Sequence, residues 1–481
     1  MHSQSNPWGA WTLAPTGAAV RAARVPFVAG VSLAALLLAH HGIAADKPDA
    51  RAQPVDIAIT TVSIVDVERG RVLPPRTVLV TNGRIVGIEA DANLPLPATA
   101  QRLDGRGRYL IPGLVDMHVH VFSYSPQRPT SEWSFPMYVA QGVTGVREMN
   151  AHGDYAAQVA RWNNAVADGA LVAPRILAVG AAVRGPSPTE AEQQVAEARR
   201  AGATFIKLYS SLPEPAWQAM RKAARANDLE FAGHVPARIS LLEAAHAGQR
   251  SGEHLTQVNE ACTPIESEVI VARRQLEGEP LMDLRVAQDL PVLQAYDQAL
   301  CDRVARALAT TGQVQVPTMV LAHAEVQPLP AARQHDPQFR QVPADVRARW
   351  NGILATLPAA PSDLSMQKWK ATLALVATLH RAGVPLMAGT DAPSPLVYPG
   401  HSLHQELALL VEAGLSPAEA LRAATLVPAR YLGIADESGT IAVGKRADLV
   451  LLDADPLQNI ANTRRIHAVL LGGKVVVSGP E

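Results

Sequence analysis

Two histidines separated by a single residue, His118 and His120, come at the end of an apolar segment that begins at Leu114. Side chains alternate between the two faces of a strand, so both imidazoles would point the same way while Val119 points the other way. Such a pair is weak evidence alone, because structural histidines are common. Four more polar residues at equivalent positions make it informative.

Those four residues also end apolar segments. Lys207 lies within residues 204–210, where an unpaired ammonium would be costly. His234, His254 and Asp391 each follow a glycine-containing apolar stretch. If these segments are neighbouring parallel strands, the six side chains converge at one end of the sheet, where barrel enzymes build their sites.

Four imidazoles, one carboxylate and one buried lysine predict a site for two metal ions. Imidazole ligands suit zinc, nickel, cobalt or iron, whereas calcium would require more oxygen ligands. Two adjacent dications produce hydroxide from a shared water and polarise a substrate carbonyl. Each residue alone has a simpler structural explanation. The six at matching strand ends favour a metal-dependent hydrolase.

The elements that must position these residues follow a repeated pattern of strand and helix. Helical patterns at 191–201, 216–226 and 239–247 separate several of the apolar segments. Eight strand–helix units within 111–435 predict a (β/α)8 TIM barrel in an α/β protein. The strand segments are 114–121, 143–150, 175–180, 204–210, 230–236, 251–256, 314–321 and 385–392.

The two ends of the mature chain look different from its middle. Strands are expected at 57–67 and 77–88, with a hairpin turn at Asn82-Gly83, and again at 448–452 and 467–477. We therefore expect residues 52–110 and 436–481 to form one small β-sandwich domain together. Two insertions, 259–312 and 322–364, would lie over the barrel rim and hold the substrate specificity.

Composition excludes several classes of protein. The 481 residues include 43 Lys+Arg and 44 Asp+Glu, for a net charge of −1, and only 4% are aromatic. A nucleic-acid-binding protein would show a basic excess and stacking aromatics. Two cysteines exclude a disulfide scaffold, and 48% hydrophobic residues can bury a large core. A large soluble globular protein remains, and we expect it to be an enzyme.

The first 45 residues read as a leader. Arg21 and Arg24 precede an apolar run over 25–39, and small residues lead to Ala44 and Ala45. This is the pattern of a cleaved signal peptide, with an uncleaved anchor as the alternative. We expect export to the periplasm or medium, without stable membrane insertion after cleavage. There Cys262 and Cys301 could pair, although two free thiols remain an alternative.

Several motifs carry a family resemblance. The motifs are Ile111-Pro112-Gly113-Leu114-Val115-Asp116-Met117-His118-Val119-His120, Lys207, His234, His254, Gly389-Thr390-Asp391, Ala423-Ala424-Thr425, Gly444-Lys445, Ala447-Asp448-Leu449-Val450 and Asp455-Pro456. With these motifs the chain resembles the amidohydrolase superfamily, and its closest branch looks like the imidazolonepropionase-like and prolidase-like hydrolases.

The resemblance implies roles for the six residues. His118, His120 and Asp391 would hold one divalent ion, with zinc expected, and His234 and His254 the other. Lys207, carbamylated by carbon dioxide, would bridge the two ions. Asp391 would also take a proton from the bridging water and deliver it to the leaving amine.

The expected reaction is hydrolysis of an amide-type carbon–nitrogen bond in a small peptide, N-acyl amino acid or cyclic amide. Esters, lactones or phosphoesters could be cleaved at the same site. A non-catalytic metal-binding protein of the envelope is the alternative from another class. The sequence leaves the native metal and the oligomeric state open; homo-oligomers are common.

Further residues are candidates for substrate contact or support. Tyr209 shares a strand face with Lys207, so it could contact substrate or pack in the barrel. Tyr124, Asn150, His323 and His401 are expected near strand-end loops, as pocket or rim residues. Arg147 and Glu148 end the second barrel strand, where an internal ion pair is the simplest explanation for at least one of them.

Overall fold

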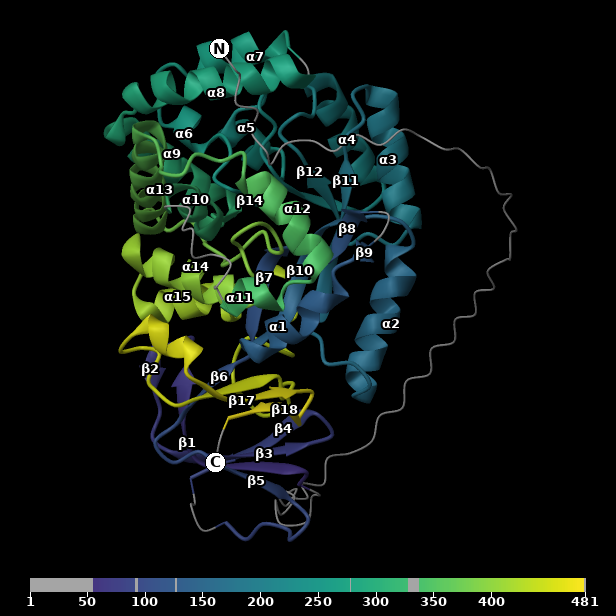
Figure 1. The fold of residues 1–481 in the computed structure, drawn as a ribbon, viewed down its shortest axis with the longest axis vertical. Helices are drawn as coiled ribbons and strands as arrows, with labels where there is room; N and C mark the ends of the chain where they lie inside the picture. Colours follow the sequence, from purple (N-terminus) through teal and green to yellow (C-terminus); the bar gives the residue numbers. More distant parts are fainter. Residues whose placement is uncertain (1–54, 91–93, 126–127, 277, 328–336, 480–481) are drawn as a thin grey trace, which may run out of the picture. The chain divides into compact units, whose positions relative to one another are not determined.

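The computed structural model describes residues 55–479 except 91–93, 126–127, 277 and 328–336 (Figure 1). The predicted signal peptide over 1–45 lies outside the described residues. None of the described helices combines the length and apolar character needed to cross a bilayer.

Strands from both ends of the chain form one sheet, which Figure 1 shows as purple and blue strands beside yellow ones. Strand β16 pairs antiparallel with β6, joining the two ends as predicted. In the described residues the order is β18-β17-β16-β6-β1-β3-β4, with β2 and β5 also on β1. The strands are β1 (Ile57–Asp66), β2 (Arg71–Val72), β3 (Arg76–Thr81), β4 (Arg84–Glu89), β5 (Gln101–Asp104), β6 (Tyr109–Pro112), β16 (Leu449–Leu452), β17 (Ile466–Leu471) and β18 (Lys474–Ser478).

A bulge in β1 lets this sheet enclose a core of its own. Thr61 has φ +56°, and the register with β3 shifts between Ile59 and Val62. The first half of β1 pairs with β3 and the second half with β6. Ile59 and Leu451, from opposite ends of the chain, are fully buried in one cluster. The predicted β-sandwich domain is confirmed as an architecture, and its limits at 52–110 and 436–481 stay a prediction.

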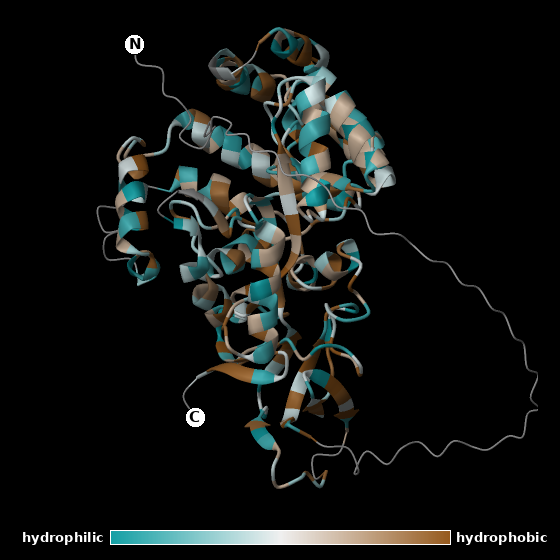
Figure 2. Cartoon of the chain, turned by 90° about the vertical axis from the view of Figure 1, so that its right-hand side faces the viewer, coloured by the Kyte–Doolittle hydropathy of each residue, from teal (hydrophilic) through white to brown (hydrophobic). Residues whose placement is uncertain are grey.

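The middle of the chain forms the predicted barrel. Among the described residues, parallel strands run in the order β15-β14-β13-β12-β11-β10-β7. Figure 2 shows helices with alternating hydrophobic and hydrophilic faces around brown, hydrophobic strands. The strands are β7 (Leu114–Val119), β10 (Val143–Ala151), β11 (Arg175–Val183), β12 (Phe205–Leu208), β13 (Glu230–Gly233), β14 (Ser251–Glu253) and β15 (Val314–Val316).

Helices lie between and after these strands. Where the sequence predicted helices at 191–201, 216–226 and 239–247, the structure has α3, α4 and α5. Ser187 caps α3, accepting a hydrogen bond from the Glu190 amide. The helices are α1 (Phe135–Ala140), α2 (Tyr155–Asp168), α3 (Pro188–Arg200), α4 (Glu214–Ala226), α5 (Leu241–His246), α9 (Gln298–Thr311), α13 (Asp363–Arg381), α14 (His401–Glu412), α15 (Pro417–Ala423) and α16 (Leu426–Tyr431).

The eighth barrel position is irregular. Residues 385–392 make isolated parallel bridges, Leu386 to Gln315 and Ala392 to Val119, instead of a continuous ladder. Asp391 has φ +67°, which no regular strand allows. Its amide nevertheless donates a 2.8 Å hydrogen bond to the His118 carbonyl, so the barrel closes between its first and eighth positions.

The seventh strand is shorter than predicted. The expectation of a strand through residue 321 is wrong, because β15 ends at Val316 and Met319 begins helix α10. Pro317 has no amide hydrogen for a ladder, and Thr318 has φ +47°. The remaining elements, mostly in the two insertions, are β8 (Phe122–Ser125), β9 (Arg128–Thr130), η2 (Glu132–Ser134), α6 (Val258–Ala261), α7 (Glu266–Arg274), α8 (Gly278–Gln294), α10 (Met319–Val326), α11 (Pro337–Gln341), α12 (Ala344–Leu354) and η4 (Ile460–Arg464).

Candidate metal centre

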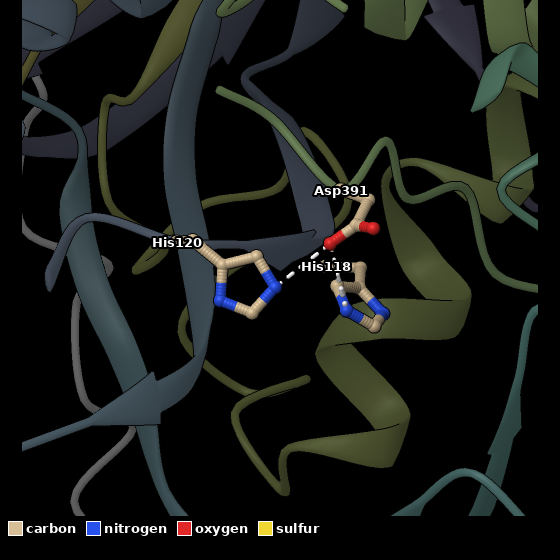
Figure 3. Close-up of side chains that lie close together, drawn as sticks. All are labelled: His118, His120 and Asp391. Atoms are coloured by element: carbon tan, nitrogen blue, oxygen red, sulfur yellow. Dashed lines mark ion pairs between the residues drawn. The ribbon is translucent and has the colours of Figure 1, made fainter. Parts of the chain in front are cut away.

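Three of the predicted ligands meet where the barrel closes. His118 and His120 come from β7 and its end, and Asp391 reaches them from the eighth position (Figure 3). Asp391 Oδ1 lies 2.7 Å from His120 Nε2 and 3.3 Å from His118 Nε2. One ligand atom from each residue lies within 4.8 Å of the others, which makes this trio a possible metal site.

The other two histidines extend the same cluster. The ring centroid of His254 lies 4.6 Å from that of His118 and 4.9 Å from that of His234. The rings of His118 and His120 are 5.4 Å apart. The structure therefore brings all four predicted histidines together at the carboxyl ends of β7, β13 and β14, as expected for parallel strands.

Lys207 lies buried within β12, with 1% of its surface exposed. Its Nζ has no hydrogen-bond partner among the described residues and lies 5.4 Å from the centre of the Tyr209 ring. Burial lowers the pKa of Lys207 to about 8, although Glu253 and Asp391 act in the opposite direction. An appreciable fraction of Lys207 is therefore present as the free amine near neutral pH. Its Nζ is thus available to bind or react.

A second set of residues orients the histidine rings, and the sequence did not single it out. Each of three rings has its Nδ1 against an oxygen of a neighbouring side chain, so that Nε2 remains for a ligand. The pairs are His118 Nδ1 with Glu253 Oε2 at 2.8 Å, His234 Nδ1 with Ser210 Oγ at 3.0 Å, and His254 Nδ1 with Thr318 Oγ1 at 2.6 Å. In the sequence, the one sign of this set was Glu253, a carboxylate next to His254 in an apolar strand.

Glu253 also has a cationic partner. Arg147 Nη2 lies 2.8 Å from Glu253 Oε1, and both side chains are almost completely buried. The predicted internal ion pair at Arg147 is confirmed. Burial alone would raise the pKa of Glu253, but Arg147 and His118 hold it well below its ordinary value. Glu253 is therefore an anion facing His118.

The protonation states suit metal binding. Burial lowers the pKa of His118, holds that of His234 well below its ordinary value, and lowers that of His254 to about 3. Burial opposes ionisation of Asp391, but His118 and His120 hold its pKa well below the ordinary value. Neutral imidazoles, an anionic carboxylate and an unpaired lysine amine fit a metal centre.

A glycine makes the close approach of the eighth position possible. A Cβ on Gly389 would lie 2.6 Å from Val316 Cγ1 and 2.9 Å from His118 Cβ. Real Cβ atoms do not approach this closely, so a side chain here would push β15 and β7 apart. Gly389 thus allows Asp391 to reach the two histidines.

The predicted substrate residues are placed less uniformly. Tyr209 does lie at the cluster, with its ring 5.1 Å from His234 and 4.1 Å from the Arg184 guanidinium. His323, on α10, has its ring 5.1 Å from Trp369 and contacts Gln327. His401 begins α14, and Asn150 is buried in β10. Tyr124 belongs to β8, and its side chain lies outside the described residues.

Comparisons with known proteins agree with this architecture. The model of the amidohydrolase family matches residues 351–476. The imidazolonepropionase of Cereibacter sphaeroides is 28% identical over 408 residues, covering 80% of this chain and 89% of the relative. Bottromycin amidohydrolase has a TM-score of 0.66 at 22% identity, covering 88% of each chain. A Xaa-Pro dipeptidase has a TM-score of 0.59 at 19% identity, covering 88% of this chain and all of its own.

The chain is similar to members of the amidohydrolase family, whose model matches its residues 351–476. It is an enzyme, a member of a class of hydrolases that act on carbon–nitrogen bonds. It is similar to imidazolonepropionases in sequence and to prolidase-like hydrolases in fold, as its motifs predicted.

Proposed function

We propose that the protein hydrolyses an amide-type carbon–nitrogen bond of a small peptide, N-acyl amino acid or cyclic amide, with two divalent ions, zinc expected, in the site. The observation that carries this proposal is the single cluster formed by four imidazoles, Asp391 and the unpaired Lys207 amine. When bound, the ions would lower the pKa of water and polarise the substrate carbonyl.

Asp391 would move the proton. Its ionised carboxylate can accept a proton from the attacking water as the water oxygen bonds to the carbonyl carbon. The same proton then passes from Asp391 to the amine nitrogen as the carbon–nitrogen bond breaks. The products are a carboxylic acid and an amine, so atoms and protons balance.

Lys207 would be modified before it acts. Its free amine forms a nitrogen–carbon bond with carbon dioxide and releases a proton, giving a carbamate with two oxygen donors. The low pKa that burial imposes on Lys207 favours the reactive form. The carbamate would lie between His118, His120 and Asp391 on one side and His234 and His254 on the other.

Relatives support the substrate class. The similar proteins include an imidazolonepropionase, a dihydroorotase and a Xaa-Pro dipeptidase, and these names cover cyclic amides and short peptides. The orientation of three imidazoles through Nδ1 is the arrangement expected around a catalytic metal.

The test is amine release or ring opening with a library of dipeptides, N-acyl amino acids and cyclic amides. Zinc-loaded wild type and Asp391→Asn would be compared, with bound metal measured in both. We expect turnover by the wild type alone. If neither protein releases product while holding metal, the proposal is wrong. Esters, lactones and phosphoesters would then be tried, and after them a non-catalytic metal-binding role.

We also propose that the protein is exported to the periplasm or medium. The leader pattern supports this proposal, as does the disulfide between Cys262 and Cys301, a bond that persists in oxidising compartments. Fractionation of cells that produce the full chain would test it. Full-length protein in the cytoplasm with both thiols reduced would contradict it.

A further inference from the structure

A cavity of about 190 Å³ lies beside His254. Its walls come from the segment that follows His254 and from helices α6, α7, α8 and α13, so the first insertion builds most of it. The charged residues that line it are Glu260, Arg273, Arg285, Asp289 and Lys368. Its volume is several times the roughly 30 Å³ of a water molecule, which leaves room for part of a substrate.

Four of these five charges are already paired. Arg273 Nη2 lies 2.9 Å from Glu260 Oε1, and its other nitrogens donate to Gln257 and Gln288 at 2.8 and 2.7 Å. Lys368 Nζ lies 2.8 Å from Asp289 Oδ2. Both carboxylates that line the cavity therefore have a cation of their own.

Arg285 is the fifth charge. Its Nε is buried and has no hydrogen-bond partner among the described residues. Its Nη1 donates to the Met282 sulfur at 3.7 Å, a weak acceptor. Burial and, after it, the charge of Arg273 lower the pKa of Arg285, although the charges of Glu260 and Asp289 act in the opposite direction. A cation desolvated in this way is costly unless an anion joins it.

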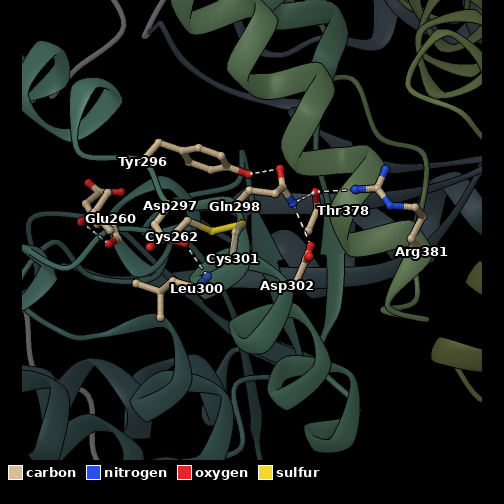
Figure 4. Close-up of a disulfide and its surroundings, with 11 residues drawn as sticks. Glu260, Cys262, Tyr296, Asp297, Gln298, Leu300, Cys301, Asp302, Thr378 and Arg381 are labelled. Atoms are coloured by element: carbon tan, nitrogen blue, oxygen red, sulfur yellow. Dashed lines mark hydrogen bonds between the residues drawn. A yellow bond between two sulfur atoms is a disulfide. The ribbon is translucent and has the colours of Figure 1, made fainter.

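Two other walls of the cavity, α6 and α13, are anchored to α9. Figure 4 shows Cys262, directly after α6, joined to Cys301 on α9. The Asp297 amide also donates to the Cys262 carbonyl at 3.0 Å. Gln298 bridges to Asp302 and Thr378, which ties α9 to α13. A cavity held by such links exists before a ligand arrives, which favours affinity.

We propose that Arg285 binds a carboxylate of the substrate, so that the enzyme selects amides that carry a free carboxylate next to the His254 side of the site. The guanidinium presents parallel N–H groups that match the two oxygens of a carboxylate. This inference rests on the proposed hydrolysis, because the molecule that Arg285 binds is a substrate only if the enzyme hydrolyses it.

Binding is tested first. N-Acetyl-L-alanine and its carboxamide differ in the charged group alone, and both would be titrated calorimetrically into the full chain and its variants. We expect tighter binding of the acid by the wild type. Arg285→Met should weaken acid binding about tenfold to a hundredfold, as for a lost charged hydrogen bond, and leave the amide unchanged. Arg285→Lys should bind the acid more weakly than the wild type and more tightly than Arg285→Met.

Arg303→Met is the matched control, since Arg303 is exposed on α9 and does not line the cavity. It should bind both probes like the wild type. Equal binding of acid and amide by the wild type, no binding of the acid, or equal losses for both in Arg285→Met would each overturn the inference.

Turnover of free and carboxamide-blocked dipeptides separates this inference from the proposed function. Hydrolysis without preference for the free acid would leave the function standing and overturn the role of Arg285. Selective binding of the acid without any hydrolysis would leave the role of Arg285 in binding a carboxylate standing and overturn the proposed function.

Discussion

One carboxylate, Glu253, has three side-chain partners inside the barrel. Its Oε2 faces His118 Nδ1, while its Oε1 accepts from Arg147 and, at 2.5 Å, from the Ser251 hydroxyl. His118 is therefore oriented by a group that is itself fixed from two sides. An imidazole held in this way would need little reorganisation to bind a metal ion.

Glu253→Gln should separate this role from simple packing. It keeps the shape of the side chain but leaves the Arg147 cation buried without its anion, which should lower the free energy of unfolding by about 3–5 kcal/mol. Metal affinity should fall about tenfold to a hundredfold. Urea denaturation and equilibrium dialysis would measure the two effects.

The matched control for Glu253→Gln is Glu230→Gln. Glu230 forms an ion pair with Arg250, and the Glu230 side chain is 54% exposed. Exposed pairs contribute about 0–1 kcal/mol, so this variant should behave like the wild type. Equal losses in both variants would contradict the role of Glu253.

Lys207→Ala should change metal content, since it removes the nitrogen that would become the bridging carbamate. We expect bound zinc to fall from two ions per chain to one or fewer, measured by elemental analysis after gel filtration. Wild type prepared in buffer depleted of carbon dioxide should show a partial loss. Two ions per chain in Lys207→Ala would show that the lysine does not bridge.

Glu406 should make stability depend on pH. Burial raises its pKa to about 8, although the Val320 and Met319 amides act in the opposite direction. Between its ordinary pKa of 4.5 and about 8, the unfolded chain loses the proton that the folded chain retains. Its contribution to stability is thus present below pH 4.5 and declines until about pH 8.

Glu406→Gln keeps an acceptor for the Val320 amide, which lies 2.8 Å from Glu406 Oε2, but cannot ionise. The variant should therefore gain stability relative to the wild type as the pH rises from 5 to 8. Urea denaturation at several pH values would measure this difference. A difference that stays constant with pH would exclude ionisation of Glu406 as the cause.

At the scale of elements, regular patterns were predictable and departures from them were not. Apolar segments and glycine-ended helices predicted the order of the barrel strands, and the strand ends predicted the six candidate site residues. No sequence pattern predicts the positive φ values of Thr318 and Asp391, since both residue types usually have negative φ. They shorten the seventh strand and break the eighth.

The side chains that orient the histidine rings could not be predicted from the sequence for a different reason. Ser210 and Thr318 orient His234 and His254 through contacts across different segments, which follow from three-dimensional packing alone. His323 and His401 were chosen for their nearness to strand ends. Helices follow those ends directly, and His323 packs on Trp369 of α13.

The disulfide provides a test at this scale. Cys262 and Cys301 close a loop with a sequence separation of 39, so replacing both by Ala should lower stability by about 2–4 kcal/mol. Thermal melting with and without a reducing agent would measure it. The wild type should lose stability on reduction and the double variant should not. Two equally sensitive proteins would show that another feature is responsible.

For the whole molecule, Asp448 links the composite sheet to the barrel. Its carboxylate lies 3.2 Å from Arg175 at the start of β11 and accepts from the Gly472 amide at 2.7 Å. Its carbonyl accepts from the Gly113 amide, directly before β7. The sheet is thus joined to the strand that carries His118.

Asp448→Asn should weaken this junction, because Arg175 loses its anion while the backbone bonds remain. We expect a lower melting temperature with little change in the chemistry of the metal centre. Calorimetry would show either one lowered transition or a separate early transition of the sheet. Asp453→Asn, which affects an exposed pair with Arg108, is the control and should melt like the wild type. An unchanged melting temperature for Asp448→Asn would contradict the link.

The closure of the barrel between its first and eighth positions also sets the order of assembly. His118 and His120 are synthesised early and Asp391 late, and the hydrogen bonds between their segments form the seam of the barrel. A nascent chain that lacks residues 385–392 has neither a closed barrel nor a complete set of ligands. Any metal that this cluster binds would therefore find its complete set of ligands only after residues 385–392 have joined the barrel.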